Sequence, residues 1–284
     1  MSVSANRYVH PRPGPFGAAL AALLNCATFA RLRQAVMGRL GFMQMASEVS
    51  GVVYLSWLVD TKAASLLAPG VRLRDDAGLT PLTVLSYRHG HFGPRRIGRL
   101  RRLLPSPLQS NWRLYLDTGP FVPDAGKHSV YFLKNIMDSL PYVAGTRLFS
   151  DIMQTHLAHS FTLTGDDGLW RVAIGAGQGS APAFFCTARE AAENLLPDAF
   201  AARFGSWRDA VTALALQDRA IGWSERQQRM VAAEIALPVA VDTVLPLQLI
   251  DCDCPMLAPL GAVGAPFAFL VPRVHFEVLS EGLL

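Results

Sequence analysis

Residues 111–119 read NWRLYLDTG, and residues 128–138 read HSVYFLKNIMD. In both stretches apolar side chains recur at alternate positions, which is the period of a strand. Similar runs at 51–60 and 79–87 flank a short helix expected at 61–70, and the last third of the chain is again mostly strand. Because these strands are not regularly interleaved with helices, the pattern predicts an antiparallel α+β domain rather than a doubly wound one.

Arg113 stands in the middle of the otherwise apolar run NWRLYL. A bare buried guanidinium is too costly, so this side chain must face either a carboxylate partner or a cavity. In a cavity, its planar fork could hold a substrate carboxylate or enolate through two hydrogen bonds. A salt bridge within the protein is the alternative.

The composition is that of a rather apolar globular chain. It has 284 residues, of which 51% are hydrophobic and 17% charged, and this length suits one large domain or two small ones. The net charge of +4 comes almost wholly from arginine; it would favour an anionic ligand without indicating nucleic acid. The cysteines show neither CxxC spacing nor the density of a disulfide scaffold, so a reduced, cytoplasmic protein is expected. The lysines are Lys62, Lys127 and Lys134, and the cysteines are Cys26, Cys186, Cys252 and Cys254.

Residues 15–45 have apolar positions at helical spacing, which predicts an N-terminal helical extension over 1–45 and a main domain over 46–284. The apolar run at 16–30 could be taken for a signal-peptide core. However, no compact basic cluster precedes it, and it is too short to cross a bilayer before Arg31 and Arg33. We therefore expect a packed helix without a membrane partner, and contact across a subunit interface in a homo-oligomer.

The stretch 150–161, SDIMQTHLAHSF, places His156 and His159 three residues apart. We expect it at the end of a helix over 143–158, where that spacing would put both side chains on one face. Asp151, one turn earlier, could orient His156. Three interpretations stay open: two zinc ligands, an acid–base or hydrogen-bonding role in a pocket, or ordinary packing. The pattern lacks the third ligand and the glutamate of familiar zinc motifs, so no metal is expected.

Two further motifs have plain interpretations. The segment 88–102 carries six arginines with His89 and His91, and we expect a solvated excursion from the sheet, with an anionic partner as the alternative. In DCDCP at 251–255, a strand would put the two thiols on one face and the two aspartates on the other, which makes a joint metal site awkward. The six arginines of the segment 88–102 are Arg88, Arg95, Arg96, Arg99, Arg101 and Arg102.

The order of these features resembles the acetoacetate-decarboxylase-like superfamily, and in particular a large bacterial branch of it. The likeness is carried by YLSWLVDTKAASLLAPGVRL at 54–73, NWRLYLDTG at 111–119 and VYFLKNIMDS at 130–139. It continues in LQDRAIGWSERQQRMVAAEI at 216–235, LPLQ at 245–248 and PRVHFEVL at 272–279. The resemblance implies a central antiparallel, barrel-like sheet around a pocket.

In acetoacetate decarboxylase a lysine forms a Schiff base with the substrate ketone. The resemblance places that position at the end of the stretch 143–158, at Ile152 to His156, where no lysine occurs. Lys134, on a neighbouring expected strand, could reach the pocket only if its side chain points inward. Relatives often carry an acidic residue where Gln109 stands. A pocket without the lysine and the carboxylate is not expected to decarboxylate through an imine.

The sequence thus predicts an enzyme of the lyase, cyclase or isomerase type that acts on a small or mid-sized carbonyl- or enol-containing substrate, without an imine and without a cofactor. The alternative is a non-catalytic carrier or sensor of a small molecule. The two differ in whether a titratable group with a perturbed pKa points into the cavity. The candidate catalytic residues are Arg113, His156 and Lys134, and the candidate substrate-binding residues are Gln109, Asn111, Tyr115, Gln154 and His159.

Overall fold

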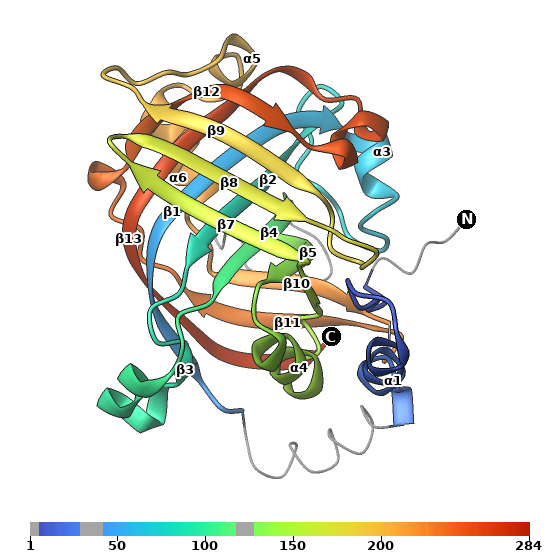
Figure 1. Cartoon of the computed structure of the whole chain (residues 1–284). Coiled ribbons are helices and arrows are strands. Elements are labelled where there is room, and N and C mark those ends of the chain that lie inside the picture. Colours follow the sequence, from blue (N-terminus) through green and yellow to red (C-terminus); the bar gives the residue numbers. More distant parts are fainter. Residues whose placement is uncertain (1–5, 29–41, 118–127, 226) are drawn as a thin grey trace.

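The computed structural model describes residues 6–28, 42–117, 128–225 and 227–284. Its centre is a closed barrel of long strands (Figure 1). The barrel order is β1-β2-β4-β5-β10-β11-β13, and β13 pairs back onto β1. All of these pairings are antiparallel except that of β5 with β10. The strands are β1 (Met45–Asp60), β2 (Leu79–Arg88), β4 (Leu108–Tyr115), β5 (Ser129–Met137), β10 (Arg219–Ser224), β11 (Arg229–Ala236) and β13 (Val263–Leu283).

A second layer of four strands covers one side of the barrel (Figure 1). It runs β12-β9-β8-β7 and joins the barrel through the pairing of β12 with β13. The layer consists of β7 (Ser160–Asp166), β8 (Leu169–Gly175), β9 (Phe184–Glu190) and β12 (Leu245–Asp253). One apolar core fills the space between the layers and a second fills the barrel, and strands such as β4 and β5 bury side chains on both faces.

Strand β4 shows how the alternating pattern divides side chains between these two cores. Trp112 and Leu114 belong to the core under the second layer, whereas Arg113 and its alternate neighbours Gln109 and Asn111 face the barrel interior. Trp112 pairs with Lys134 on β5 while Arg113 pairs with Phe132, so a bulge sets the inward and outward faces of β5 at this point. The expected α+β fold with a central, mostly antiparallel barrel is confirmed.

Short helices cover the ends of the barrel. Helix α6 (Trp207–Ala215) follows α5 (Asp198–Ala201), and both pack their apolar side chains against the barrel core. Helix α3 (Thr61–Ser65) follows β1, and α4 (Leu140–Phe149) follows β5. The remaining elements are β3 (Gly93–Pro94), β6 (Thr155–Leu157), η1 (Arg95–Leu103), η2 (Val241–Thr243) and η3 (Pro255–Leu260).

The N-terminal helical extension is described only in part. Helix α1 (Pro15–Leu24) contacts α4 through a small apolar cluster that includes Tyr8 and Val143, whereas residues 29–41 lie outside the described residues. Residues 42–44 are not helical, and β1 begins at Met45. No helix in the described ranges is long and apolar enough to cross a membrane.

The prediction of one helix over 143–158 is wrong. Helix α4 ends at Phe149, and the chain then bends into β6, which places His156 on a strand and the exposed His159 in the loop after it. Ser150 has extended backbone angles, and β6 pairs with β5. The pairing of these strands therefore overrides the helical spacing of the apolar residues. The shared helical face expected for the two histidines therefore does not exist.

The basic excursion from the sheet is confirmed in its main part. It holds β3 and η1, and the side chains of η1 are mostly exposed. His89 is an exception, because it is buried and stacks on Phe92 with ring centroids 4.4 Å apart. Gly90, directly after it, comes so close to the Glu48 carbonyl that an added Cβ would lie 2.5 Å from the oxygen.

Candidate functional site

The guanidinium of Arg113 is the central polar group of the barrel interior. Only 1% of the side chain is exposed. It donates from Nη2 to the Leu214 carbonyl at the end of α6 (2.6 Å), from Nη1 to Oε1 of Gln217, and weakly from Nε to the Tyr115 hydroxyl (3.4 Å). All three partners are neutral, so hydrogen bonds orient the cation without neutralising it.

Aromatic and hydroxyl side chains complete this support. The Tyr54 and Tyr115 rings lie 5.5 and 5.6 Å from the guanidinium carbon, a distance at which ring faces attract a cation. The Tyr115 hydroxyl also donates to the Leu214 carbonyl (2.8 Å) and bonds with Thr83 (2.8 Å). Arg113 is therefore held at a fixed place at one end of the barrel.

Within the described residues, no carboxylate forms an ion pair with Arg113. The sequence left two possibilities for Arg113, a salt bridge within the protein or a position at a cavity. The described residues contain no such salt bridge, and Arg113 does line a cavity. The hydrogen bonds to Leu214, Gln217 and Tyr115, together with an interaction with the Tyr54 hydroxyl, use only part of the N–H donors of the guanidinium. A buried cation with donors to spare is a natural partner for an anion.

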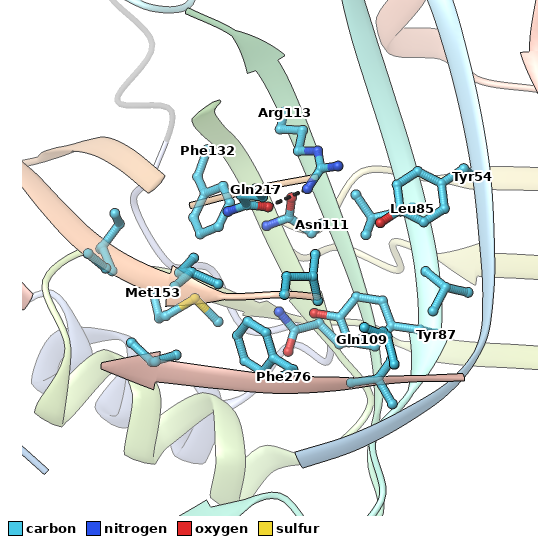
Figure 2. A pocket seen from close by; sticks show the side chains of 18 residues that line it. Tyr54, Leu85, Tyr87, Gln109, Asn111, Arg113, Phe132, Met153, Gln217 and Phe276 are labelled. Atoms are coloured by element: carbon cyan, nitrogen blue, oxygen red, sulfur yellow. Dashed lines mark hydrogen bonds between the residues drawn. The ribbon is translucent and has the colours of Figure 1, made fainter. Parts of the chain in front are cut away.

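A narrow cavity lies beside Arg113, inside the barrel. Figure 2 shows Tyr54, Leu85 and Tyr87 on one side, with Phe132, Gln217 and Met153 on the other. The space open to the centres of water molecules is about 40 Å³, enough for a few waters or one small polar group.

The amides that line this cavity have incomplete hydrogen bonding. Asn111 donates to Oδ1 of Asn135 (2.7 Å), but its own Oδ1 is buried without a partner in the described structure. Gln217 accepts from Arg113, while its Nε2 is likewise buried and unpartnered. Buried polar atoms are normally hydrogen-bonded, so these two atoms, one acceptor and one donor, are unsatisfied hydrogen-bonding groups in the wall of the cavity.

Gln109 is tied to a buried chain of polar groups behind the cavity. Its Oε1 lies 2.8 Å from Nε2 of His89, whose Nδ1 lies 2.8 Å from the Ser47 hydroxyl. Burial lowers the pKa of His89 to about 4, partly opposed by the bond to Gln109. A neutral imidazole thus fixes Gln109 and contributes no charge to the cavity at neutral pH.

The titratable groups that line the cavity among the described residues are Arg113, Tyr54 and Tyr87. Burial raises the pKa of Tyr54 and that of Tyr87, so both phenols are protonated at neutral pH. No lysine, histidine or carboxylate is among the described residues that line this space. Ile152 and Met153, from the segment where the resemblance places a Schiff-base lysine, do line it.

Two of the predicted catalytic residues lie elsewhere: Lys134 is on the outer side of β5, and His156 is on the neighbouring strand β6. Lys134 shares a face with Trp112, and burial lowers its pKa to about 8, with the nearby Glu225 acting in the opposite direction. His156 is fully buried; its Nδ1 lies 2.6 Å from the Ser180 hydroxyl, and its Nε2 has no partner in the described structure. Burial, and then Lys134 and Arg147, lower the pKa of His156 well below its usual value.

Of the predicted substrate-binding residues, some lie at the barrel cavity and others lie away from it. Gln109 and Asn111 line the barrel cavity, and Tyr115 supports Arg113 from beside it. Gln154 is buried and donates to the Ser150 and Asp151 carbonyls, so it holds the bend after α4. His159 is exposed and lines a separate surface hollow with His10.

Sequence reasoning missed four contributors to the cavity and its support: Gln217, Tyr54, Tyr87 and His89. For the tyrosines a signal was present, because each follows the alternating pattern of its strand. Gln217 lies just after α6 and reaches Arg113 across 104 positions of sequence, which no local pattern reveals.

No group of three or more histidine, cysteine or carboxylate side chains that could hold a metal ion occurs in the part of the chain that the structure describes. Cys252 and Cys254 pack against the core between the layers, and burial raises the pKa of each thiol to about 12. In this environment the two cysteines act as small hydrophobic residues.

No family model matches the chain, and no curated protein matches it. Solved structures do match in fold. The enduracididine biosynthesis enzyme MppR superposes with a TM-score of 0.55 at 13% identity, covering 86% of this chain and 88% of that one. An acetoacetate decarboxylase from Legionella pneumophila gives 0.53 at 10% identity, covering 84% and 86%.

A third match, an acetoacetate decarboxylase-like enzyme from Sphingomonas wittichii, gives a TM-score of 0.53 at 8% identity and covers 84% of this chain and 92% of that one. Identities this low establish the fold alone. The chain has the acetoacetate-decarboxylase-like fold, as the resemblance in sequence order implied.

Proposed function

We propose that this protein is an enzyme that binds a carbonyl- or enol-containing carboxylate in the barrel cavity and transforms it without an imine intermediate. The observation that carries the proposal is Arg113, a buried cation that lines the cavity and has no carboxylate partner in the described structure. Arg113 would bind the carboxylate or the enolate oxygen of the substrate.

The chemistry available to this cavity is electrostatic. A fixed cation and oriented neutral donors stabilise negative charge that develops on a carbonyl oxygen. Gln217 supplies a donor beside Arg113, and the protonated phenols of Tyr54 and Tyr87 supply others. Such a site favours a lyase, cyclase or isomerase step in which negative charge develops on the carbonyl oxygen, with a water molecule as the acceptor of any proton released from carbon.

An imine route receives no support from the arrangement of the cavity. It requires an amine within reach of the substrate carbonyl, whereas Lys134 lies on the outer face of β5. The solved structures of MppR include complexes with pyruvate and with a condensation product of pyruvate and imidazole 4-carboxaldehyde. These ligands of a protein with the same fold make 2-oxo acids the first substrate class to examine.

A non-catalytic carrier or sensor is the second candidate function. A specific observation favours it: no histidine, lysine or carboxylate is among the described residues that line the cavity, so a general base is lacking there. The same cation and amides would then hold the ligand without changing it.

Calorimetric titration with pyruvate, 2-oxobutanoate and acetoacetate tests the binding step. We expect binding to the wild-type protein, a loss of at least about thirtyfold in affinity for Arg113→Gln, and wild-type affinity for the exposed control Arg96→Gln. Equal affinities of Arg113→Gln and wild type would refute the proposed site.

A measurement of ligand turnover then distinguishes the enzyme hypothesis from the carrier hypothesis. Proton NMR in D₂O follows the consumption of each ligand and the exchange of its C–H protons next to the carbonyl. Turnover or exchange that Arg113→Gln abolishes supports the enzyme, whereas binding with neither supports the carrier. Borohydride trapping followed by intact mass should give no adduct; an adduct that disappears in Lys134→Ala would overturn the imine-free proposal.

A further inference from the structure

An apolar groove runs along α4 on the outside of the barrel, and we call it the α4 groove. Its walls include Phe42, Phe92, Leu104, Tyr142 and Phe149. The space open to the centres of water molecules is about 460 Å³, compared with about 40 Å³ for the barrel cavity. Phe149 remains 56% exposed in it. Helix α4 and strand β3, which flank the groove, lie at the same end of the molecule in Figure 1.

The polar side chains of the α4 groove have partners within the protein. The Ser150 hydroxyl donates to Glu281, and the Thr146 hydroxyl bonds with the Tyr142 carbonyl and with Thr155. The Tyr142 hydroxyl donates to the Phe92 carbonyl (2.8 Å). Because these groups are already paired, the groove offers a ligand mainly apolar contact.

The α4 groove and the barrel cavity share two lining residues, Met153 and Val278. The side chains of these two residues therefore border both spaces. In Figure 2, Met153 and Phe276 lie on the side of the cavity away from Arg113, with Gln109 and Tyr87 near that same end. Met153 is only half buried, and an unbranched thioether changes rotamer easily.

The barrel cavity and the α4 groove, taken together as one space, differ in the chemistry of their walls. The inner part is small and contains the cation and the unpartnered amide atoms of Asn111 and Gln217. The outer part is about ten times larger in the same measure and is apolar. A ligand that occupies both parts must carry its charge at one end and its bulk at the other.

We infer that the ligand of this protein is an amphipathic oxo acid, whose carboxylate and carbonyl lie at Arg113 and whose apolar chain passes Met153 into the α4 groove. The inference rests on the proposed anion site at Arg113 and narrows its substrate class from small oxo acids to medium-chain ones. Met153 would shift its side chain to open the passage.

The test is a calorimetric series of straight-chain 2-oxo acids: pyruvate, 2-oxobutanoate, 2-oxohexanoate, 2-oxooctanoate and 2-oxodecanoate. We expect affinity to rise about two- to fourfold per added methylene until the groove is filled, because each buried methylene is removed from water. Phe149→Glu places a charge in the groove and should flatten this rise with chain length. Leu66→Glu, at an 83% exposed leucine in the turn after α3, is the matched control.

The outcomes separate this inference from the proposed function. Arg113-dependent binding of short acids with no gain from chain length would overturn the inference and leave the Arg113 site standing. A failure of every acid to bind would overturn both. Chain-length dependence that persists in Arg113→Gln would mean that the groove binds apolar chains by itself, which also refutes the inference. The inference would also be refuted if Phe149→Glu changed only the self-association of the protein, measured by light scattering. The groove would then hold a second copy of this chain.

Discussion

Arg113 on β4 donates from Nη1 to Oε1 of Gln217, a residue 104 positions later in the chain. The same guanidinium donates to the Leu214 carbonyl at 2.6 Å, so β4 and the end of α6 meet at one buried charge. Both acceptors are neutral. Burying this cation therefore costs folding free energy that neutral acceptors offset only in part.

Arg113→Met should separate stability from binding. Replacing a buried charge with an apolar side chain of similar length often leaves stability unchanged or raises it. Removing the partner of Gln217 offsets part of that gain. We expect the free energy of unfolding in urea to change by less than about 2 kcal/mol, while oxo-acid affinity falls at least about thirtyfold. A severe loss of stability would indicate instead that Arg113 is mainly a structural tie between β4 and α6.

Gln217→Glu should neutralise the site without changing its shape. A carboxylate beside Arg113 would pair with the guanidinium and repel an anionic ligand. We expect pyruvate affinity to fall at least about tenfold, whereas the neutral analogue pyruvamide should bind as it does to wild type. Gln248→Glu, at an exposed position of β12, is the matched control. Equal effects on the charged and the neutral ligand would argue against a charge-based site.

Acid should weaken the fold partly through His89. Burial lowers its pKa from 6.5 to about 4, so the unfolded chain binds a proton there more readily than the folded one. The resulting stability is fully present above about pH 6.5 and is lost as the pH falls towards 4. For this buried group the loss is about 3 kcal/mol.

Urea unfolding of His89→Asn across that pH range provides the measurement. Losing the contacts of the imidazole lowers stability at every pH, but the decline on acidification should be shallower than in wild type by about the amount above. Parallel pH profiles for the two proteins would show that His89 does not titrate in this way.

Trp112→Ala should weaken the protein without changing its anion site. Trp112 is fully buried between the layers, where its ring packs against Phe184 and its Nε1 donates to Ser110 (3.1 Å). The cavity left behind should cost about 3–5 kcal/mol of unfolding free energy. Arg113, one residue later, faces the other way, so oxo-acid affinity measured well below the unfolding temperature should stay at the wild-type value. A parallel loss of affinity would mean that the two cores are coupled.

Much of the fold could be predicted from local sequence pattern. The alternating runs at 111–119 and 128–138 predicted strands, and the structure contains them as the paired strands β4 and β5. These predictions hold because a strand with one side chain facing each way repeats every two residues regardless of its partners. The helix predicted over 143–158 was wrong because pairing of β6 with β5 is a non-local contact that overrides helical spacing.

The sequence by itself determined that Arg113 would be a buried cation in need of a partner, since the residues around it are apolar and burial of a charge is costly. Only the tertiary structure decided what that partner is. Barrel closure brings Gln217 and the Leu214 carbonyl to the guanidinium, while the β5 bulge pairs Lys134 with Trp112 on the outer face. The direction of each side chain depends on strand register and on contacts between residues far apart in the chain, and these are fixed only when the whole barrel forms.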